Sequence, residues 1–350
     1  MTEKLTVSLD CMGGDRAPQI VVEGANIIAS LDPDVHFLLF GDSKRIKPIL
    51  NSCIHLKDRH TIIHTEEFIS SDEKPSIALR RGIRSSMRLA IDAVKNKEAD
   101  VIISAGNTGA LMAMAKIVLR PLPSISRPAI VTSIPNRKKQ ATVFLDMGAN
   151  IECSSEVLFQ FAVMGRAFAR IVLKIPKPTI GLLNVGSEET KGNDLVRGAA
   201  ALLRESNLRD DFYGYVEGDG VVSGVVDVVV TDGFCGNITL KAIEGTCKMV
   251  AGLVKDGFMD SIWSKIGYLF AGYSINKFAK TVDPRIHNGA MLVGLNGVVV
   301  KSHGSTDSGG FANAIKVAIS LVRNKINEQI TKEIESSTIH GLKDDKVNDK

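Results

Sequence analysis

The sequence predicts an α/β protein with a doubly wound, mostly parallel sheet in a three-layer α/β/α arrangement. Short β-branched segments alternate with longer amphipathic segments along most of the chain, an order that produces parallel β-α-β units. Residues 225–230 are apolar at nearly every position, as expected for a strand covered by helices on both faces. Three of the short segments end in glycine-flanked turns, and open α/β sheets bind ligands at the carboxyl ends of their strands.

The same pattern places the individual elements. We expect strands at residues 5–10, 36–40, 60–64, 101–104, 129–133, 141–145, 180–185, 225–230 and 290–300. We expect helices at residues 17–30, 76–95, 108–119, 154–173, 194–205, 237–255 and 312–335. Proline favours the first turn of a helix, so Pro18 fits the start of the first one. These elements predict one domain over residues 1–337, followed by a flexible polar tail at 338–350.

Composition narrows the class of protein. The 350 residues are 44% hydrophobic and carry a net charge of only +4, which argues against a nucleic-acid-binding protein. The five cysteines stand far apart and form no C-x-x-C pair, which favours reduced thiols in the cytoplasm. Residues 1–10 are too charged for a signal peptide, and we expect no membrane-spanning helix because no long apolar run occurs.

The glycine-flanked turns occupy residues 104–110, 184–193 and 231–237. Glycine lets the backbone approach a ligand closely, and the free amides at a helix start attract anions. A lysine in such a turn, as at Lys191, can pair with a phosphate group. The three turns therefore predict one anionic substrate site. His303 precedes a further Gly-Ser-Thr-Asp segment, and a site residue or a helix-capping loop fits it equally well.

Several familiar motifs are absent from the sequence. No G-x-G-x-x-G follows the first predicted strand, and neither a Walker A sequence nor a G-x-S-x-G elbow occurs. His60 and His64 flank a β-branched segment without a following glutamate, so a structural role is favoured over a metal site. We therefore expect neither a bound cofactor nor a metal ion.

Residues 254–282 form an apolar segment that differs from the rest of the chain. Phe258, Ile262 and Ile266 recur at helical spacing, lysines are interspersed, and the only tryptophan is Trp263. One interpretation is a core helix or a dimer interface. The alternative is a helix that lies on a membrane surface or docks a lipid-carrying partner.

Six motifs in order resemble those of the PlsX-type phosphate acyltransferases. The first reads Asp-Cys-Met-Gly-Gly-Asp-Arg-Ala-Pro at residues 10–18, and the others lie at 104–110, 145–150, 181–193, 231–240 and 301–307. The resemblance runs in order from about residue 5 to residue 325, nearly the whole chain. The sequence departs from the family pattern at Cys11, at residues 286–290 and at the Gly309-Gly310 pair, which affects local geometry more than the assignment.

The resemblance implies an activity and its partners. The family forms acyl phosphate from inorganic phosphate and a long-chain acyl group carried on acyl carrier protein. The product supplies a membrane glycerol-3-phosphate acyltransferase in bacterial phospholipid synthesis. The resemblance further implies a homodimer and a fold similar to the phosphotransacetylases and the isocitrate and isopropylmalate dehydrogenases. The cysteines favour the cytoplasm, and the apolar segment suits peripheral contact with the inner face of the cell membrane. The alternatives are a phosphotransacetylase for short acyl-CoA and a non-catalytic membrane scaffold.

The family's motifs also imply roles for particular residues. Lys191 and Asn237 correspond to the proposed catalytic residues, with Asn237 as an oxyanion donor or, alternatively, a plain helix cap. Substrate binding is expected from Gly106, Asn107, Thr108, Gly109, Asn193, Gly236 and His303. An arginine cluster at residues 80–88 is either a solvated helix face or a docking patch for the acidic carrier protein.

Overall fold

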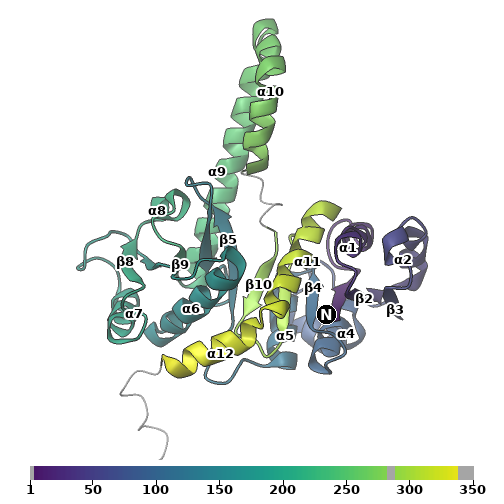
Figure 1. Cartoon of the computed structure of the whole chain (residues 1–350), viewed down its shortest axis with the longest axis horizontal. Helices are drawn as coiled ribbons and strands as arrows, with labels where there is room; N and C mark the ends of the chain where they lie inside the picture. The colour runs from purple at the N-terminus through teal and green to yellow at the C-terminus, as the bar shows by residue number, and fades with distance from the viewer. Residues whose placement is uncertain (1–3, 282–287, 338–350) are drawn as a thin grey trace, which may run out of the picture.

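The computed structural model describes residues 4–281 and 288–337, and these form an eleven-stranded sheet with helices packed around it (Figure 1). The tail expected at 338–350 and the last residue of the apolar segment lie outside the described residues. The strands are β1 (Leu5–Asp10), β2 (Val35–Gly41), β3 (His60–His64), β4 (Val101–Ser104), β5 (Ala129–Pro135), β6 (Ala141–Leu145), β7 (Ile180–Leu183), β8 (Phe212–Val216), β9 (Val228–Val230), β10 (Ala290–Val293) and β11 (Val298–Lys301).

The sheet is parallel on both sides of an antiparallel centre. Its order is β3-β2-β1-β4-β11-β10-β5-β6-β9-β7-β8. The β11-β10, β10-β5 and β5-β6 pairs are antiparallel and the other pairs are parallel. The predicted α/β class with a mostly parallel sheet is therefore confirmed.

Helices cover both faces of this sheet. The longer helices are α1 (Gln19–Leu31), α2 (Ser43–Leu50), α3 (Pro75–Arg81), α4 (Ser86–Lys95), α5 (Thr108–Leu119), α6 (Ser155–Phe168), α7 (Asp194–Glu205), α8 (Gly218–Ser223), α9 (Gly233–Met259), α10 (Ile262–Thr281), α11 (Ser308–Arg323) and α12 (Ile326–Ser336). Alternate residues of β4 enter two separate cores: Val101 and Ile103 pack with α1, α6 and α11, whereas Ile102 packs with α4 and α5. This alternation follows from the two-residue period of a strand.

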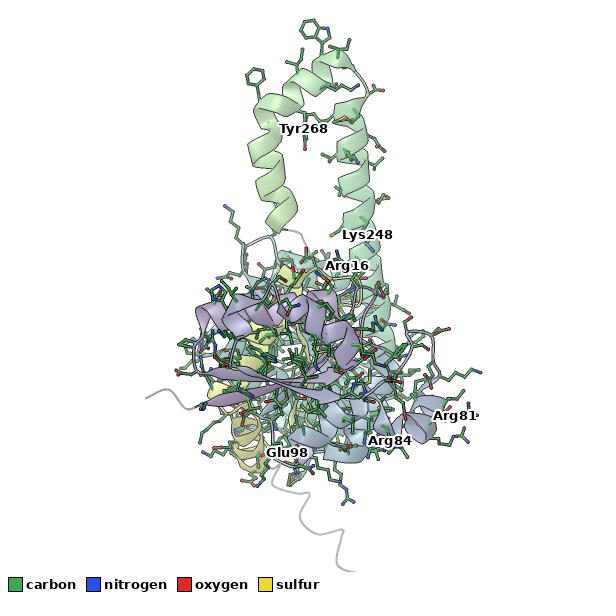
Figure 2. The ribbon with its side chains drawn as sticks, turned by 90° about the vertical axis from the view of Figure 1, so that its right-hand side faces the viewer. Arg16, Arg81, Arg84, Glu98, Lys248 and Tyr268 are labelled. Carbon is green, nitrogen blue, oxygen red and sulfur yellow. The ribbon has the colours of Figure 1, made fainter. Side chains whose placement is uncertain are left out.

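Helices α9 and α10 leave the body of the protein as an antiparallel pair (Figures 1 and 2). Trp263 is 82% exposed and Phe270 is 87% exposed, while Val250 and Leu253 are exposed on α9. The described side chains of the apolar segment are thus mostly outside the core of this chain. None of the helices in residues 4–281 and 288–337 is long and apolar enough to span a membrane.

Several element boundaries differ from those expected. The helix expected at 76–95 is divided into α3, a 3₁₀ turn at Gly82–Arg84 and α4, because Ser85 caps a new helix by accepting a hydrogen bond from the Arg88 amide. The helix expected at 312–335 is divided at Lys325, which has a left-handed backbone. The segment 290–300 contains two antiparallel strands, and β8 and α8 were not predicted.

Candidate active site

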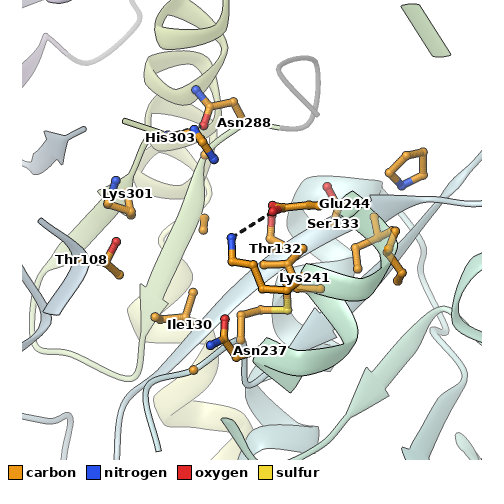
Figure 3. A pocket seen from close by; sticks show the side chains of 18 of the residues that line it. Thr108, Ile130, Thr132, Ser133, Asn237, Lys241, Glu244, Asn288, Lys301 and His303 are labelled. Atoms are coloured by element: carbon orange, nitrogen blue, oxygen red, sulfur yellow. Dashed lines mark hydrogen bonds and ion pairs between the residues drawn. The ribbon is translucent and has the colours of Figure 1, made fainter. Parts of the chain in front are cut away.

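A cavity of about 1320 Å³ opens between the two parallel halves of the sheet (Figure 3). It is larger than most pockets for small ligands, which span about 300–1,000 Å³. Its polar lining includes Thr108, Lys116, Arg137, Lys139, Asn237, Lys241, Glu244, Asn288, Lys301 and His303. Its apolar lining includes Met112, Ile130, Ile134, Met147, Val222, Leu240 and Ile243. The cavity therefore combines an apolar wall with several cations and hydrogen-bond donors.

The first glycine turn is held by a buried hydrogen-bond network. The Asp10 carboxylate accepts hydrogen bonds from the hydroxyls of Ser86 (2.6 Å) and Ser104 (2.7 Å). Ser104 Oγ in turn accepts from the Gly106 amide at 3.0 Å. Burial raises the pKa of Asp10, and the two serine hydroxyls oppose that rise. The network fixes the turn whose next residues, Thr108 and Gly109, line the cavity.

Asn107 has a structural place in the same turn. Its Oδ1 caps α5 by accepting from the Ala110 amide at 3.0 Å. Its Nδ2 donates to the carbonyls of Ser71 (3.0 Å) and Glu73 (2.8 Å). Asn107 therefore orients the start of α5. The first two residues of that helix, Thr108 and Gly109, line the cavity.

Lys301 and His303 lie where β11 ends at the same edge of the sheet. Lys301 Nζ donates to the carbonyl oxygens of Ala105 (3.2 Å) and Ser302. Burial lowers the pKa of Lys301 to about 8, although Asp10 and Asp15 oppose the shift. Burial also lowers the pKa of His303, and the Lys301 charge adds to this effect.

Asn288 organises the loop that carries His303. Its Nδ2 donates to Ser302 Oγ (2.8 Å) and to the Gly310 carbonyl (2.9 Å). Its Oδ1 accepts from the His303 amide at 2.9 Å. The loop after β11 is therefore tied both to the strand and to α11, which gives His303 a fixed position in the cavity.

A second buried carboxylate supports the opposite wall. Asp146 accepts hydrogen bonds from the amides of Ile130 (3.0 Å), Ala149 (3.0 Å) and Asn150 (2.7 Å). The resulting loop places Gly148 beside the Asn237 side chain. Gly236 lies against the same loop, since a Cβ there would come within 1.8 Å of the Asp146 carbonyl oxygen.

The structure brings together some of the residues predicted for the site. Thr108, Gly109, Asn237 and His303 line one cavity (Figure 3). Gly106, Asn107 and Gly236 support its walls without lining it.

Two predicted residues lie outside the cavity lining. Lys191 and Asn193 are exposed on the loop after β7. There the Lys191 amide donates to the Glu188 carbonyl (3.0 Å), and Asn193 caps α7 by accepting from the Val196 amide. Because β7 and β9 are parallel neighbours, this loop is at the same edge of the sheet as Asn237.

The structure also corrects the local setting of Asn237. Helix α9 begins at Gly233, and Asp232 caps it by accepting from the Cys235 amide at 2.8 Å. Asn237 therefore stands inside the helix and is not its cap. Its side chain has no hydrogen-bond partner among the residues that the structure describes.

Sequence reasoning missed several residues of the cavity. Lys301 belongs to one of the recognised motifs and directly follows a run of valines, a pattern that indicates the end of a strand. Lys241 and Glu244 form an ion pair at 2.9 Å on α9, at the spacing of one helical turn. Within the described ranges, no three His, Cys, Asp or Glu residues gather closely enough to hold a metal ion.

Comparison with known proteins identifies the family. A family model described as a fatty acid synthesis protein matches residues 5–329. The phosphate acyltransferase of Paramagnetospirillum magneticum is 54% identical over 335 residues, covering 96% of this chain and 95% of that protein. The chain belongs to the phosphate acyltransferase family. The phosphate acyltransferase of Rhodospirillum centenum is 52% identical over 334 residues, and the match covers 95% of this chain and 94% of that protein. The chain is accordingly an acyltransferase.

Solved structures show the same fold at lower identity. A phosphotransacetylase from Streptococcus pyogenes superposes with a TM-score of 0.61 at 19% identity, covering 91% of this chain and 94% of that one. The EutD phosphotransacetylase from Staphylococcus aureus gives a TM-score of 0.58 at 16% identity, and the match covers 91% of this chain and 94% of that chain. The phosphate acyltransferase shares the phosphotransacetylase fold, as predicted from the resemblance.

Proposed function

We propose that this phosphate acyltransferase forms acyl phosphate from inorganic phosphate and a long-chain acyl group on acyl carrier protein, for phosphatidic acid synthesis. The observation that supports this most is the single cavity in which polar groups at strand ends adjoin an extended apolar wall. An acetyl group would leave most of that wall empty, whereas a fatty acyl chain would cover it. The product would pass to a membrane glycerol-3-phosphate acyltransferase.

The chemistry needs no protein nucleophile. An oxygen of hydrogen phosphate attacks the thioester carbonyl carbon, the C–O bond forms, and the C–S bond breaks. The proton of the phosphate ends on the departing pantetheine sulfur, so the products are an acyl phosphate dianion and a thiol. The protein's contribution is to position the two substrates and to stabilise the developing oxyanion.

Our proposal gives two residues catalytic roles. The Asn237 amide donates to the thioester oxygen as negative charge develops there. Lys191, at the same edge of the sheet, stabilises the thiolate as it leaves. Asn193 positions the Lys191 loop by capping α7. Thr108, Gly109 and His303 contact the phosphate, and Gly106, Asn107 and Gly236 hold the surrounding turns.

Basic groups near the cavity suit an acidic carrier protein. Lys116, Arg137 and Lys139 line the cavity, and the last two lie on the β5-β6 turn. Arg81 at the end of α3 and Arg84 in the following turn are exposed (Figure 2), whereas Arg88 is paired with Asp92 at 3.1 Å. Charge complementarity of this kind raises the association rate and weakens with salt.

The deciding experiment measures acyl phosphate formed by the pure protein from inorganic phosphate. We expect product from long-chain acyl carrier protein and little from acetyl-CoA, because only the long chain fills the apolar wall. Product from acetyl-CoA alone would make the protein a phosphotransacetylase, and no product from either donor would favour the scaffold alternative.

In the same assay, Lys191→Ala should lower kcat about tenfold or more, the order of a lost charge contact. A wild-type rate would remove Lys191 from the proposal.

We further propose that the α9-α10 hairpin has two uses. Met249, Val250, Leu253 and Val254 form an exposed apolar stripe on α9, which suits pairing with a second copy in a homodimer. Trp263 and Phe270 lie further along the hairpin and suit peripheral contact with the inner face of the cell membrane.

The membrane contact can be tested by co-sedimentation with anionic phospholipid vesicles. Replacing both Trp263 and Phe270 with alanine should reduce the bound fraction several-fold, because two exposed aromatic side chains supply much of the apolar area available for insertion. Tyr213→Ala, at an exposed aromatic residue on β8, is the matched control and should bind normally. Equal binding by all three proteins would contradict the membrane role, and light scattering of the same proteins without vesicles would report whether they are dimers.

A further inference from the structure

Three side chains stand in one row across adjacent parallel strands. Asp10 of β1 is in register with Ser104 of β4, and Ser104 is in register with Lys301 of β11. The row therefore places a carboxylate, a hydroxyl and an ammonium at the same height, where the strands end at the cavity. The carboxylate accepts hydrogen bonds from the Ser86 and Ser104 hydroxyls and from the Met12 amide. The ammonium donates to two backbone carbonyls.

Lys301 is a cation whose local partners are incomplete. Its ammonium group carries three N–H donors, and two backbone carbonyls accept from it. In the described part of the chain, no carboxylate lies within ion-pair distance of Lys301. A lysine charge withdrawn from water without a contacting anion is unfavourable. The geometry thus leaves a place for an anion on the cavity side.

The neighbouring groups are hydrogen-bond donors. Thr108 and Gly109 are the first residues of α5, so their amides have no partner within the helix. The Ser305 amide donates to His303 Nδ1 at 3.3 Å, which places the proton of the neutral imidazole on Nε2. His303 therefore presents an N–H donor, and the Thr108 hydroxyl is a further one (Figure 3). Donors from three segments surround the same end of the cavity.

We propose that Lys301 holds the phosphate group that reacts, with Thr108, Gly109 and His303 donating to its other oxygens. This inference rests on the proposed function only for the fate of the phosphate, since binding itself needs no acyl donor. A phosphate dianion is a suitable anion, because it supplies the charge that Lys301 lacks and acceptors for several N–H groups. The same chemistry is offered by the phosphodiester of a pantetheine arm, and the experiment separates the two.

The charged groups around Lys301 and His303 should make the affinity for phosphate depend on pH. Asp10 and Asp15 face Lys301 from β1 and the loop after it, and Lys241, Glu244 and Lys248 of α9 act on His303. The lowered pKa of Lys301 means that the empty site loses its positive charge as the pH rises through about 8. Phosphate affinity should therefore fall by up to tenfold per pH unit above that point. Arginine stays charged throughout this range.

The test is titration of the purified protein with inorganic phosphate alone, by calorimetry, between pH 7 and 10. At pH 7, Lys301→Met should weaken binding about tenfold or more, and Lys301→Arg should stay within a few-fold of wild type. The wild-type affinity should fall above about pH 8, while that of Lys301→Arg stays level. Lys95→Met removes an exposed lysine that does not line the cavity and should leave phosphate binding unchanged.

Each result has a definite meaning. Unchanged phosphate binding in Lys301→Met, or the same pH profile in wild type and Lys301→Arg, would overturn the inference. So would a Lys301→Met protein that binds phosphate normally but shows a raised KM only for the acyl donor, since Lys301 would then contact the pantetheine phosphodiester. If Lys301→Met does not fold, the Lys301→Arg profile still decides. Normal phosphate binding without acyl transfer would refute the proposed function and leave this site standing.

Discussion

Asn237→Ala is expected to lower kcat by about 10²–10³-fold, with little change in either KM. The reason is that an oxyanion donor acts on charge that develops only in the transition state. The Asn237 amide lines the cavity and, within the described residues, has no protein partner that would be left unpaired by the substitution. The variant should therefore fold normally, and steady-state rates of acyl phosphate formation measure the effect.

Two further variants separate a donor role from a simple change of shape. Asn237→Asp keeps the size of the side chain but replaces the N–H donor with a negative charge, so its kcat should fall at least as far as that of Asn237→Ala. Thr239→Ala is the matched control on the same helix, because the Thr239 hydroxyl bonds only to the Cys235 carbonyl. A wild-type kcat in Asn237→Asp would show that Asn237 donates nothing to the reaction.

The parts of the site that sequence predicted are those governed by local rules. Helix α5 has the predicted bounds because Asn107 is a good N-cap and Pro121 follows its end. Thr108 and Asn237 were found because each follows a glycine turn after an apolar strand. Parallel strands then bring those turns to one edge of the sheet, which the alternating pattern predicts without knowledge of the strand order.

The parts that sequence missed depend on contacts between distant segments. Lys301 is important because β11 lies next to β4, and that pairing joins segments about two hundred residues apart. The position of Asn237 relative to the cavity depends on where α9 leaves the body, which no local pattern specifies. The glycine at position 82 has the same origin, because a Cβ there would approach Ile69 Cδ1 to 2.5 Å. Such close contacts are visible only once the fold is assembled.

Gly236 shows how one such contact supports the active site. Helix α9 approaches the loop at Asp146 so closely that a Cβ at Gly236 would lie 1.8 Å from the Asp146 carbonyl oxygen. This obstacle is backbone, and the loop that contains it is fixed by several hydrogen bonds to the buried Asp146 carboxylate. Neither side can yield without moving Asn237 away from Gly148, its neighbour in the cavity wall.

Gly236→Ala is therefore expected to reduce the free energy of unfolding by more than about 3 kcal/mol, the upper end of ordinary overpacking. The apparent Tm at a fixed scan rate should fall by roughly 5 °C or more. Gly245→Ala is the matched control, because Gly245 lies on the same helix with no atom within 4 Å of its ideal Cβ. That substitution should stabilise the helix by up to about 1 kcal/mol through the higher helix propensity of alanine. If Gly236→Ala had the wild-type Tm and kcat, the close approach of α9 to Asp146 would not be what positions Asn237.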